Sequence, residues 1–159
     1  MKGPLGTLAI AAALLTAVPL AHAEEQTRET YKAQVEPICE VNREANERIM
    51  DGAQKRLNKR EYVPLGKQFV RLSESFGKVI PKLAAVPAPV GDEHRVERWF
   101  EQMRLLKTRL RRTGKYYKEE QEIKAAHEAI LAERSGIAAN NISIVFKVRN
   151  CRFSRFDRG

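Results

Sequence analysis

The chain has 159 residues, of which 43% are hydrophobic and 31% charged, and its formal net charge at neutral pH is +9. This length suffices for one domain with a hydrophobic core, and two cysteines exclude more than one intramolecular disulfide. A positive charge of this size keeps a protein soluble and attracts anionic partners, but it does not indicate a fold.

The N-terminal residues 1–23 have the parts of a secretory signal peptide. Lys2 supplies the positive charge, the stretch 8–20 is apolar, and the sequence AHA at 21–23 matches the small-x-small pattern that signal peptidase cleaves. The apolar stretch is short for a membrane span of about 20 residues, with an uncleaved anchor as the alternative. We expect cleavage after Ala23, an extracytoplasmic location, and a single helical domain comprising residues 24–159.

The two cysteines, Cys39 and Cys151, lie far apart in the sequence. In an oxidising compartment they favour one intramolecular disulfide, because no third thiol competes for either of them. In the chain-entropy model, closing a loop of this length stabilises the fold by about 4–5 kcal/mol. Two buried free thiols or a bridge between two chains are the alternatives.

Two helices are predicted in the first half of the exported chain. The first covers 30–57 and contains Pro37, which should kink it or mark its first turn. The second begins at Pro64, which suits a first helical turn because proline lacks an N–H. Its apolar stripe consists of Leu65, Phe69, Leu72, Phe76, Val79 and Leu83. A proline-rich connector, AVPAPVG, follows.

Two further helices are predicted in the second half. The third runs from an N-cap at Asp92 to Gly114, which ends it. Its apolar stripe consists of Val96, Trp99, Met103, Leu106 and Leu110. The stripe of the fourth consists of Tyr116, Ile123, His127, Ile130, Ile137, Asn141, Ile144 and Val148.

Four amphipathic helices with short connections predict an all-α fold, an up-down-up-down four-helix bundle. At 1.5 Å per residue, an unbroken last helix would carry Cys151 roughly 54 Å from its start, whereas Cys39 lies roughly 29 Å from the end of the first helix. A disulfide needs Cα atoms within about 7 Å of each other. Both distances are compatible with a disulfide only if the two helices start at different levels or if the last helix stops early. The run Ile142, Ile144, Val145 and Val148 is rich in β-branched residues and favours an extended path. We therefore expect the last helix to end or break between Ser135 and Asn141 and the remainder to fold back.

Asparagines lie near both cysteines in the sequence: Asn42, Asn46, Asn140 and Asn141. Asn42 and Asn141 fall on the predicted apolar stripes, where an unpaired amide is costly. Amides that face one another across the first and last helices would pair and fix the helix register, as buried asparagine does in coiled coils. The functional alternative is a polar pocket for a small ligand.

The segment 103–118 contains basic residues and no acidic one. They are Arg104, Lys107, Arg109, Arg111, Arg112, Lys115 and Lys118, and the C-terminal tail adds Lys147, Arg149, Arg152, Arg155 and Arg158 against Asp157. A basic amphipathic helix can lie on an anionic membrane. The alternative is a bundle helix whose apolar face is buried and whose charges are solvated. An anionic membrane surface or an envelope polymer would be the partner, since the expected location argues against nucleic acid.

The sequence lacks the patterns of common catalytic and metal sites. His94 and His127 are not spaced to bind zinc or di-iron on a helix, and no glycine-rich phosphate loop or G-x-S-x-G elbow is present. Met103 and His127 could meet across antiparallel helices as haem ligands, although a core role for each is the simpler interpretation. We therefore predict a non-enzymatic protein without a metal or cofactor.

The stretch YKAQVEPICEVNREAN, the proline-rich hinge, the late AANN and the terminal NCRF together resemble a group of small exported actinobacterial proteins, mostly uncharacterised. The similarity covers most of the chain after residue 23. Its most specific parts are the E-P-I-C and C-R-F contexts of the cysteines. The resemblance implies an exported helical domain with Cys39 and Cys151 paired, and it implies no activity.

These features together predict an exported, non-enzymatic helical bundle of the cell envelope with a binding or structural role. The alternative is a protein that associates with a membrane surface or a polyanion through the basic segment 103–118 and the basic C-terminal tail. The charge run favours the alternative, and the four apolar stripes with the cysteine pair favour the bundle.

Overall fold

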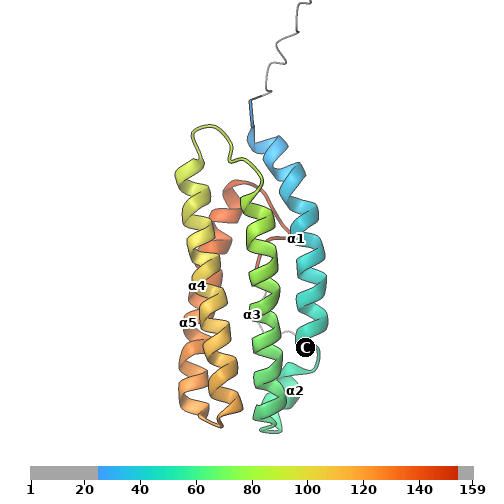
Figure 1. Cartoon of the computed structure of the whole chain (residues 1–159), viewed down its shortest axis with the longest axis vertical. Helices are drawn as coiled ribbons and strands as arrows, with labels where there is room; N and C mark the ends of the chain where they lie inside the picture. Colours follow the sequence, from blue (N-terminus) through green and yellow to red (C-terminus); the bar gives the residue numbers. More distant parts are fainter. Residues whose placement is uncertain (1–24, 154–159) are drawn as a thin grey trace, which may run out of the picture.

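The computed structural model describes residues 25–153, and these residues form helices and no strand. The helices are α1 (Arg28–Met50), α2 (Ala53–Asn58), α3 (Tyr62–Ala84), α4 (Glu93–Lys118) and α5 (Glu122–Val145). The four long helices alternate in direction, and the short α2 lies beside the first turns of α3 (Figure 1). The predicted all-α, up-down-up-down bundle is confirmed. The predicted signal peptide, 1–23, and the basic residues Arg155 and Arg158 lie outside the described residues.

The first predicted helix, 30–57, is in fact two helices, because the chain turns at Asp51 and Gly52. Gly52 has a φ of 68°, in the left-handed region that glycine adopts without steric cost. Gln68 of α3 secures this end of α1, because its Nε2 donates to the carbonyl oxygens of Ile49 (2.9 Å) and Asp51 (2.8 Å). The last carbonyls of a helix lack partners within it, so this buried amide fixes where α1 ends.

The apolar stripes predicted for the second and third helices are confirmed. All members of both stripes are buried: Leu65, Phe69, Leu72, Phe76, Val79 and Leu83 on α3, and Val96, Trp99, Met103, Leu106 and Leu110 on α4. Pro64 lies in the first turn of α3, as predicted. Asp92 occupies the N-cap position of α4, but its carboxylate binds the guanidinium groups of Arg28 and Arg95 instead of a helix N–H.

Gly114 does not end α4, contrary to the prediction, since the helix continues to Lys118. This glycine instead allows close packing, because it faces Gly66 of α3 and both residues are buried. A Cβ atom on Gly114 would lie 2.6 Å from the carbonyl oxygen of Gly66. The two backbones can therefore touch only where neither residue has a side chain.

The apolar stripe predicted for the last helix is on the exposed face of α5, so this prediction is wrong. The side chains of Ile123, Ile130, Ile137 and Ile144 are 42% to 87% exposed, and His127 and Asn141 are exposed with them. The buried residues of α5 are Ala125, Glu128, Ala132, Gly136, Ala139 and Ser143. These mostly small residues let α5 lie close to α4, and they recur at helical spacing as the isoleucines do. Periodicity alone could not distinguish the two faces.

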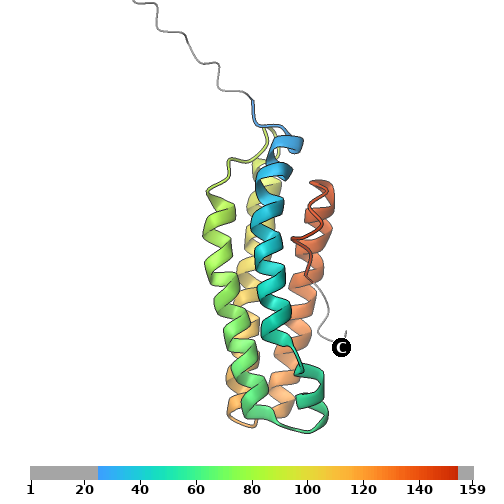
Figure 2. The ribbon, with the colours of Figure 1, turned by 90° about the vertical axis from the view of Figure 1, so that its right-hand side faces the viewer.

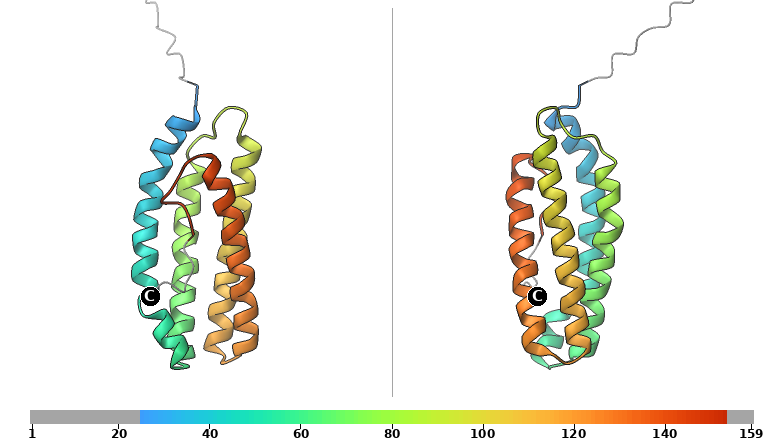
Figure 3. Two further views of the ribbon diagram at one scale, coloured as in Figure 1. Left: turned by 180° about the vertical axis from the view of Figure 1, so that it is seen from behind. Right: turned by 60° about the vertical axis from the view of Figure 1, so that its left-hand side comes forward.

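The last helix also continues without interruption through 135–141, where a break is predicted from the sequence, so that prediction is wrong. The helix ends at Val145, and the segment 146–153 then runs back between α1 and α5 (Figures 2 and 3). Phe146 and Val148 are buried in this return. The distance between the cysteines does require a reversal, but the reversal follows the helix.

Cys39 and Cys151 form the predicted disulfide. Their Cα atoms are 4.8 Å apart, within the range that a disulfide permits. Cys39 is buried in the middle of α1. The disulfide therefore joins the returning segment to α1, a helix that α5 barely contacts.

Candidate ligand-binding cleft

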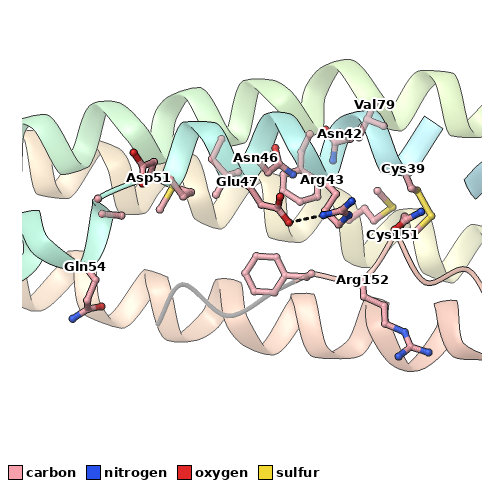
Figure 4. Close-up of a pocket in the computed structure, with 18 of the residues that line it drawn as sticks. Cys39, Asn42, Arg43, Asn46, Glu47, Asp51, Gln54, Val79, Cys151 and Arg152 are labelled. Carbon is pink, nitrogen blue, oxygen red and sulfur yellow. Dashed lines mark hydrogen bonds and ion pairs between the residues drawn. A yellow bond between two sulfur atoms is a disulfide. The ribbon is translucent and has the colours of Figure 1, made fainter. Parts of the chain in front are cut away.

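An elongated cleft with a volume of about 890 Å³ runs along α1, on the side that faces α5 (Figure 4). Its lining comes from α1, α2, α3, the segment 150–153 and, in α4, Met103. Among the described residues, none of α5 lines the cleft. The volume lies within the range of small-molecule sites, about 300–1,000 Å³.

The cleft exists because α1 and α5 barely contact each other. α1 packs on α3, and α5 packs on α4. The small buried residues of α5, such as Ala125, Ala132 and Ala139, let this helix lie against α4 and away from α1. Toward the start of α1 the gap is filled by Phe146, whose ring centroid is 5.4 Å from that of Tyr31. Farther along α1 the gap stays open and forms the cleft.

The segment 149–153 forms one wall of the cleft, and its first attachment is to α1. Glu36 Oε1 accepts hydrogen bonds from the backbone N–H groups of Arg149 (3.0 Å) and Asn150 (3.3 Å). The disulfide follows one residue later, at Cys151. A carboxylate and a covalent bond thus hold this side of the wall together.

The second attachment of the wall is to α5. Asn140 Oδ1 accepts a hydrogen bond from the N–H of Phe153 (2.6 Å), and its Nδ2 donates to the carbonyl oxygen of the same residue (2.9 Å). The ring of Phe153 lies against Gly136, where a Cβ atom would come within 2.4 Å of it. Gly136 is therefore a contact site for the wall, and the chain does not break there.

The floor of the cleft is apolar. It consists of Leu72, Phe76, Val79 and Leu83 of α3 together with Met103 of α4. All of them belong to the hydrophobic core, so a bound molecule would extend the core.

The opposite edge of the cleft is polar and comes from α1. Its residues are Asn42, Arg43, Asn46 and Glu47. Asn42 Oδ1 accepts a hydrogen bond from Ser75 Oγ of α3 at 2.8 Å. Arg43 Nη1 donates to Glu47 Oε1 at 2.7 Å, and this hydrogen bond holds the pKa of the guanidinium above its ordinary value. The ion pair is visible as a dashed line in Figure 4.

Two buried atoms on this polar edge, Arg43 Nε and Asn46 Oδ1, have no hydrogen-bond partner among the described residues. Such atoms are uncommon in folded proteins, and each costs about 1–3 kcal/mol. Arg43 and Asn46 are three residues apart on α1, so they share one face of the helix. The two atoms lie one turn apart, but both have almost no accessible surface, so they lie behind the edge of the cleft and not in its open space.

The predicted pairing of amides between the first and last helices does not occur. Asn141 is exposed on the outer face of α5, and Asn42 bonds to Ser75 of α3 instead. Asn46 lines the cleft but its side-chain oxygen is buried without a partner, whereas Asn140 holds the wall. The four asparagines therefore have different roles, and Asn42 and Asn46 are the two that line the cleft.

Arg43 and Glu47 are cleft residues that the sequence pattern does not single out. An Arg–Glu pair four residues apart is common on exposed helix faces, so it carries no functional signal by itself. The one available signal is that this pair alternates with Asn42 and Asn46 directly after Cys39. The α3 residues of the floor are predictable from the sequence as core residues, but nothing in the sequence indicates that they line a cleft.

The basic residues considered for contact with an anionic surface lie along α4, and many of them pair with acidic residues. Arg104 pairs with Glu97, Arg109 and Arg112 with Glu128, and Lys115 with Glu119. Glu128 is buried on α5, so its contact with Arg109 at 3.0 Å joins the two helices. Within 25–153, Lys107, Arg111 and Lys118 have no such pair.

The apolar face of α4 lies in the core, from Val96 to Leu110. α4 is therefore a bundle helix with solvated charges, and it could insert that face into a membrane only if the bundle opened. No helix within the described part of the chain has the length and apolar character needed to span a bilayer.

Met103 and His127 do not meet. Met103 is buried at the floor of the cleft, whereas His127 is exposed on the outer face of α5. The haem interpretation is therefore wrong for this pair. Across residues 25–153, no three His, Cys, Asp or Glu side chains are grouped so as to hold a metal ion.

No family model, curated protein or solved structure matches the chain.

Proposed function

We propose that the protein is an exported, non-enzymatic binding protein of the cell envelope, and that a small ligand occupies the cleft between α1 and the segment 149–153. The supporting observation is the cleft itself, which has a volume of about 890 Å³, an apolar floor on α3 and a polar edge on α1. A concave apolar site with a few convergent polar groups is the usual form of a small-molecule site.

Export is supported by the signal-peptide pattern of residues 1–23 and by the disulfide, because disulfides persist in oxidising compartments. The same bond serves the cleft, since it holds the wall against α1. The disulfide between Cys39 and Cys151 thus needs an oxidising compartment to persist, and the shape of the cleft depends on this disulfide.

Expression of the full chain in a bacterial secretion host tests the export. We expect the protein in the extracytoplasmic fraction, with Glu24 as its first residue and with a mass that corresponds to one disulfide. A cytosolic protein that retains residues 1–23 would contradict the proposal.

Titration of the exported protein with Nile red, a neutral dye whose emission rises in apolar surroundings, tests the binding. Met50 lines the cleft and is half-buried, so Met50→Trp should fill part of it and abolish the dye signal. Val41 is 66% exposed on the same helix, so Val41→Trp is the matched control and should leave the signal unchanged. Binding by folded Met50→Trp that equals that of the parent would show that the dye does not use the cleft.

A second candidate function is association with an anionic surface through α4. It is favoured by the exposed Arg111 and Lys118, which have no ion pair within the described residues. Sedimentation with anionic vesicles, weakening with salt, should then exceed sedimentation with neutral vesicles, and the Arg111→Glu, Lys118→Glu double variant should lose the difference. Equal retention on both vesicle types would dismiss this function.

A further inference from the structure

The outer face of α5 carries four exposed isoleucines that the proposed function does not use. They recur at every seventh residue, and they are Ile123, Ile130, Ile137 and Ile144. Their exposed fractions range from 42% to 87%. The outer face of a bundle helix usually carries polar side chains. A row of large apolar side chains along about six turns therefore indicates an interaction surface.

The spacing of this isoleucine row indicates that its partner is another helix. A strict seven-residue repeat is the period at which two α-helices stay in contact as they wind around each other. A flat surface such as a membrane makes no such demand, because it contacts any side chain of the outer face. α5 lies at one edge of the bundle (Figure 2), so a helix of another molecule can lie beside the row without opening the bundle.

The charge of α5 favours a second copy of the chain as that molecule. Apart from buried Glu128, the charged residues of α5 are two acidic and two basic ones, Glu122, Glu133, Lys124 and Arg134. On the neighbouring α4, Arg109 and Arg112 are already paired with Glu128. The formal net charge of the chain is +9, so two copies repel each other at long range. They can approach most closely through a helix that adds no net charge to the surface.

A pair of α5 helices from two copies also forms a closed interface. The same row serves both copies, which is the arrangement of a two-fold dimer, the commonest oligomer. Because the row is evenly spaced, isoleucines can lie opposite isoleucines whether the two helices run parallel or antiparallel. Arg134 is exposed beside the row, and a long arginine side chain can keep its guanidinium in water while its carbons cover apolar surface.

The size of the row indicates a weak dimer. From Ile123 to Ile144 the row is about 32 Å long, and a helix is about 10 Å wide, so two copies would bury on the order of 600 Å² or somewhat more. Interfaces below about 1,200 Å² belong mostly to transient complexes. We therefore expect a dissociation constant on the order of 100 μM, with monomers in dilute solution.

We propose that the protein forms a reversible dimer with a second copy of itself through the isoleucine row of α5. Among the residues that the structure describes, none of α5 lines the cleft. The pairing therefore uses no cleft residue, and its test is independent of the proposed binding function.

Sedimentation equilibrium of the exported protein, from about 5 to about 500 μM, tests the pairing on either side of the expected dissociation constant. We expect the average mass to rise from that of a monomer toward that of a dimer. A mass that stays monomeric would overturn the inference. A mass that continues past the dimer would also overturn it, because a two-fold interface closes.

The variant Ile137→Glu locates the contact. It places a carboxylate on each side of the pair and should keep the protein monomeric over the whole range. Val41 is also an exposed apolar residue, but it lies on α1, so Val41→Glu is the matched control and should dimerise as the parent does. Both sites are exposed, so both melting temperatures in dilute solution should stay within about 3 °C of the parent. Dimerisation of folded Ile137→Glu equal to that of the parent would place the contact elsewhere and overturn the inference.

A milder variant, Ile130→Ala, keeps the test decisive if Ile137→Glu fails to fold. Loss of apolar side-chain area from both copies should weaken dimerisation about tenfold or more, and an unchanged dissociation constant would count against the row. Lipid is the remaining occupant to examine. A parent that stays monomeric and sediments with vesicles, while Ile130→Ala sediments less, would show that a membrane covers the row and would overturn the pairing.

Discussion

α3 and α5 both carry large apolar side chains at helical spacing, yet they bury opposite kinds of face. α3 buries leucines, phenylalanines, a valine and an isoleucine, whereas α5 buries alanines, a glycine, a serine and Glu128. Four isoleucines of α5 are exposed, and they are Ile123, Ile130, Ile137 and Ile144. Large side chains bring more apolar area out of water than small ones do. α3 is thus held by its own core face, and α5 depends more on additional attachments.

The additional attachments of α5 come from outside its apolar face. Buried Glu128 accepts hydrogen bonds from Arg109 of α4, and Asn140 binds the backbone of Phe153. The returning segment is in turn bonded to α1 through Cys39 and Cys151. The returning segment crosses the open side of the bundle between α1 and α5, and its residues 150–153 line the cleft there.

Removal of the disulfide should have the largest effect. We expect the double variant Cys39→Ser, Cys151→Ser to lose about 4–5 kcal/mol in free energy of unfolding, because its unfolded chain is no longer constrained. Chemical denaturation measures the loss. Hydrogen exchange in the variant should increase more in α5 and the segment 146–153 than in α3. A uniform increase would contradict the difference between the two helices.

Truncation of large side chains compares the two helices directly. Leu72→Ala, on the buried face of α3, should cost about 2–5 kcal/mol through lost contacts and a cavity. Ile130→Ala, on the exposed face of α5, should change the stability by no more than about 0.5 kcal/mol. A cost above about 2 kcal/mol for Ile130→Ala would show that the isoleucine face is covered in the native protein.

Enlargement of a small side chain tests the buried face of α5. Ala132 is fully buried, so Ala132→Leu should separate α5 from α4 and cost about 1–3 kcal/mol. Ala126 is exposed on the same helix, and Ala126→Leu is the control that should be neutral. Thermal unfolding distinguishes the two variants. If Ala132→Leu were as stable as the parent, close α4–α5 packing would be excluded.

The smallest expected effect concerns Asp92, which ties α4 to the start of α1. The Arg28 guanidinium hydrogen-bonds this carboxylate and holds its pKa below the ordinary value. A carboxylate with a lowered pKa contributes stability that is present above its unfolded pKa and lost as the pH falls through its folded pKa. Arg28 is about half exposed, so Asp92→Asn should cost only about 1 kcal/mol at neutral pH.

Measurement of stability against pH checks the assignment to Asp92. The difference between the parent and Asp92→Asn should shrink as the solution becomes acidic enough to protonate the carboxylate in the folded protein. Glu101→Gln, an exposed site on the same helix, is the control and should follow the parent at every pH. A difference that persists in strong acid would assign the effect to packing and not to charge.

Residue type and spacing are enough to place a helix in the core where one of its faces is large and apolar and the other is polar. The stripes of α3 and α4 satisfy that condition, so periodicity was enough to place them in the core. The pairing of Cys39 with Cys151 was also accessible, because no other cysteine is present. These features depend on side-chain type and spacing alone.

Contacts between helices set three features that residue spacing does not: the buried face of α5, the end of α1 and the point where the chain turns back. The face of α5 depends on how closely it lies to α4, and the end of α1 depends on Gln68, which comes from another helix. The cleft depends on the same distance between α5 and α4, because a helix that packs closely on α4 lies farther from α1. Contacts between segments distant in sequence set these distances, and spacing along one helix carries no information about them.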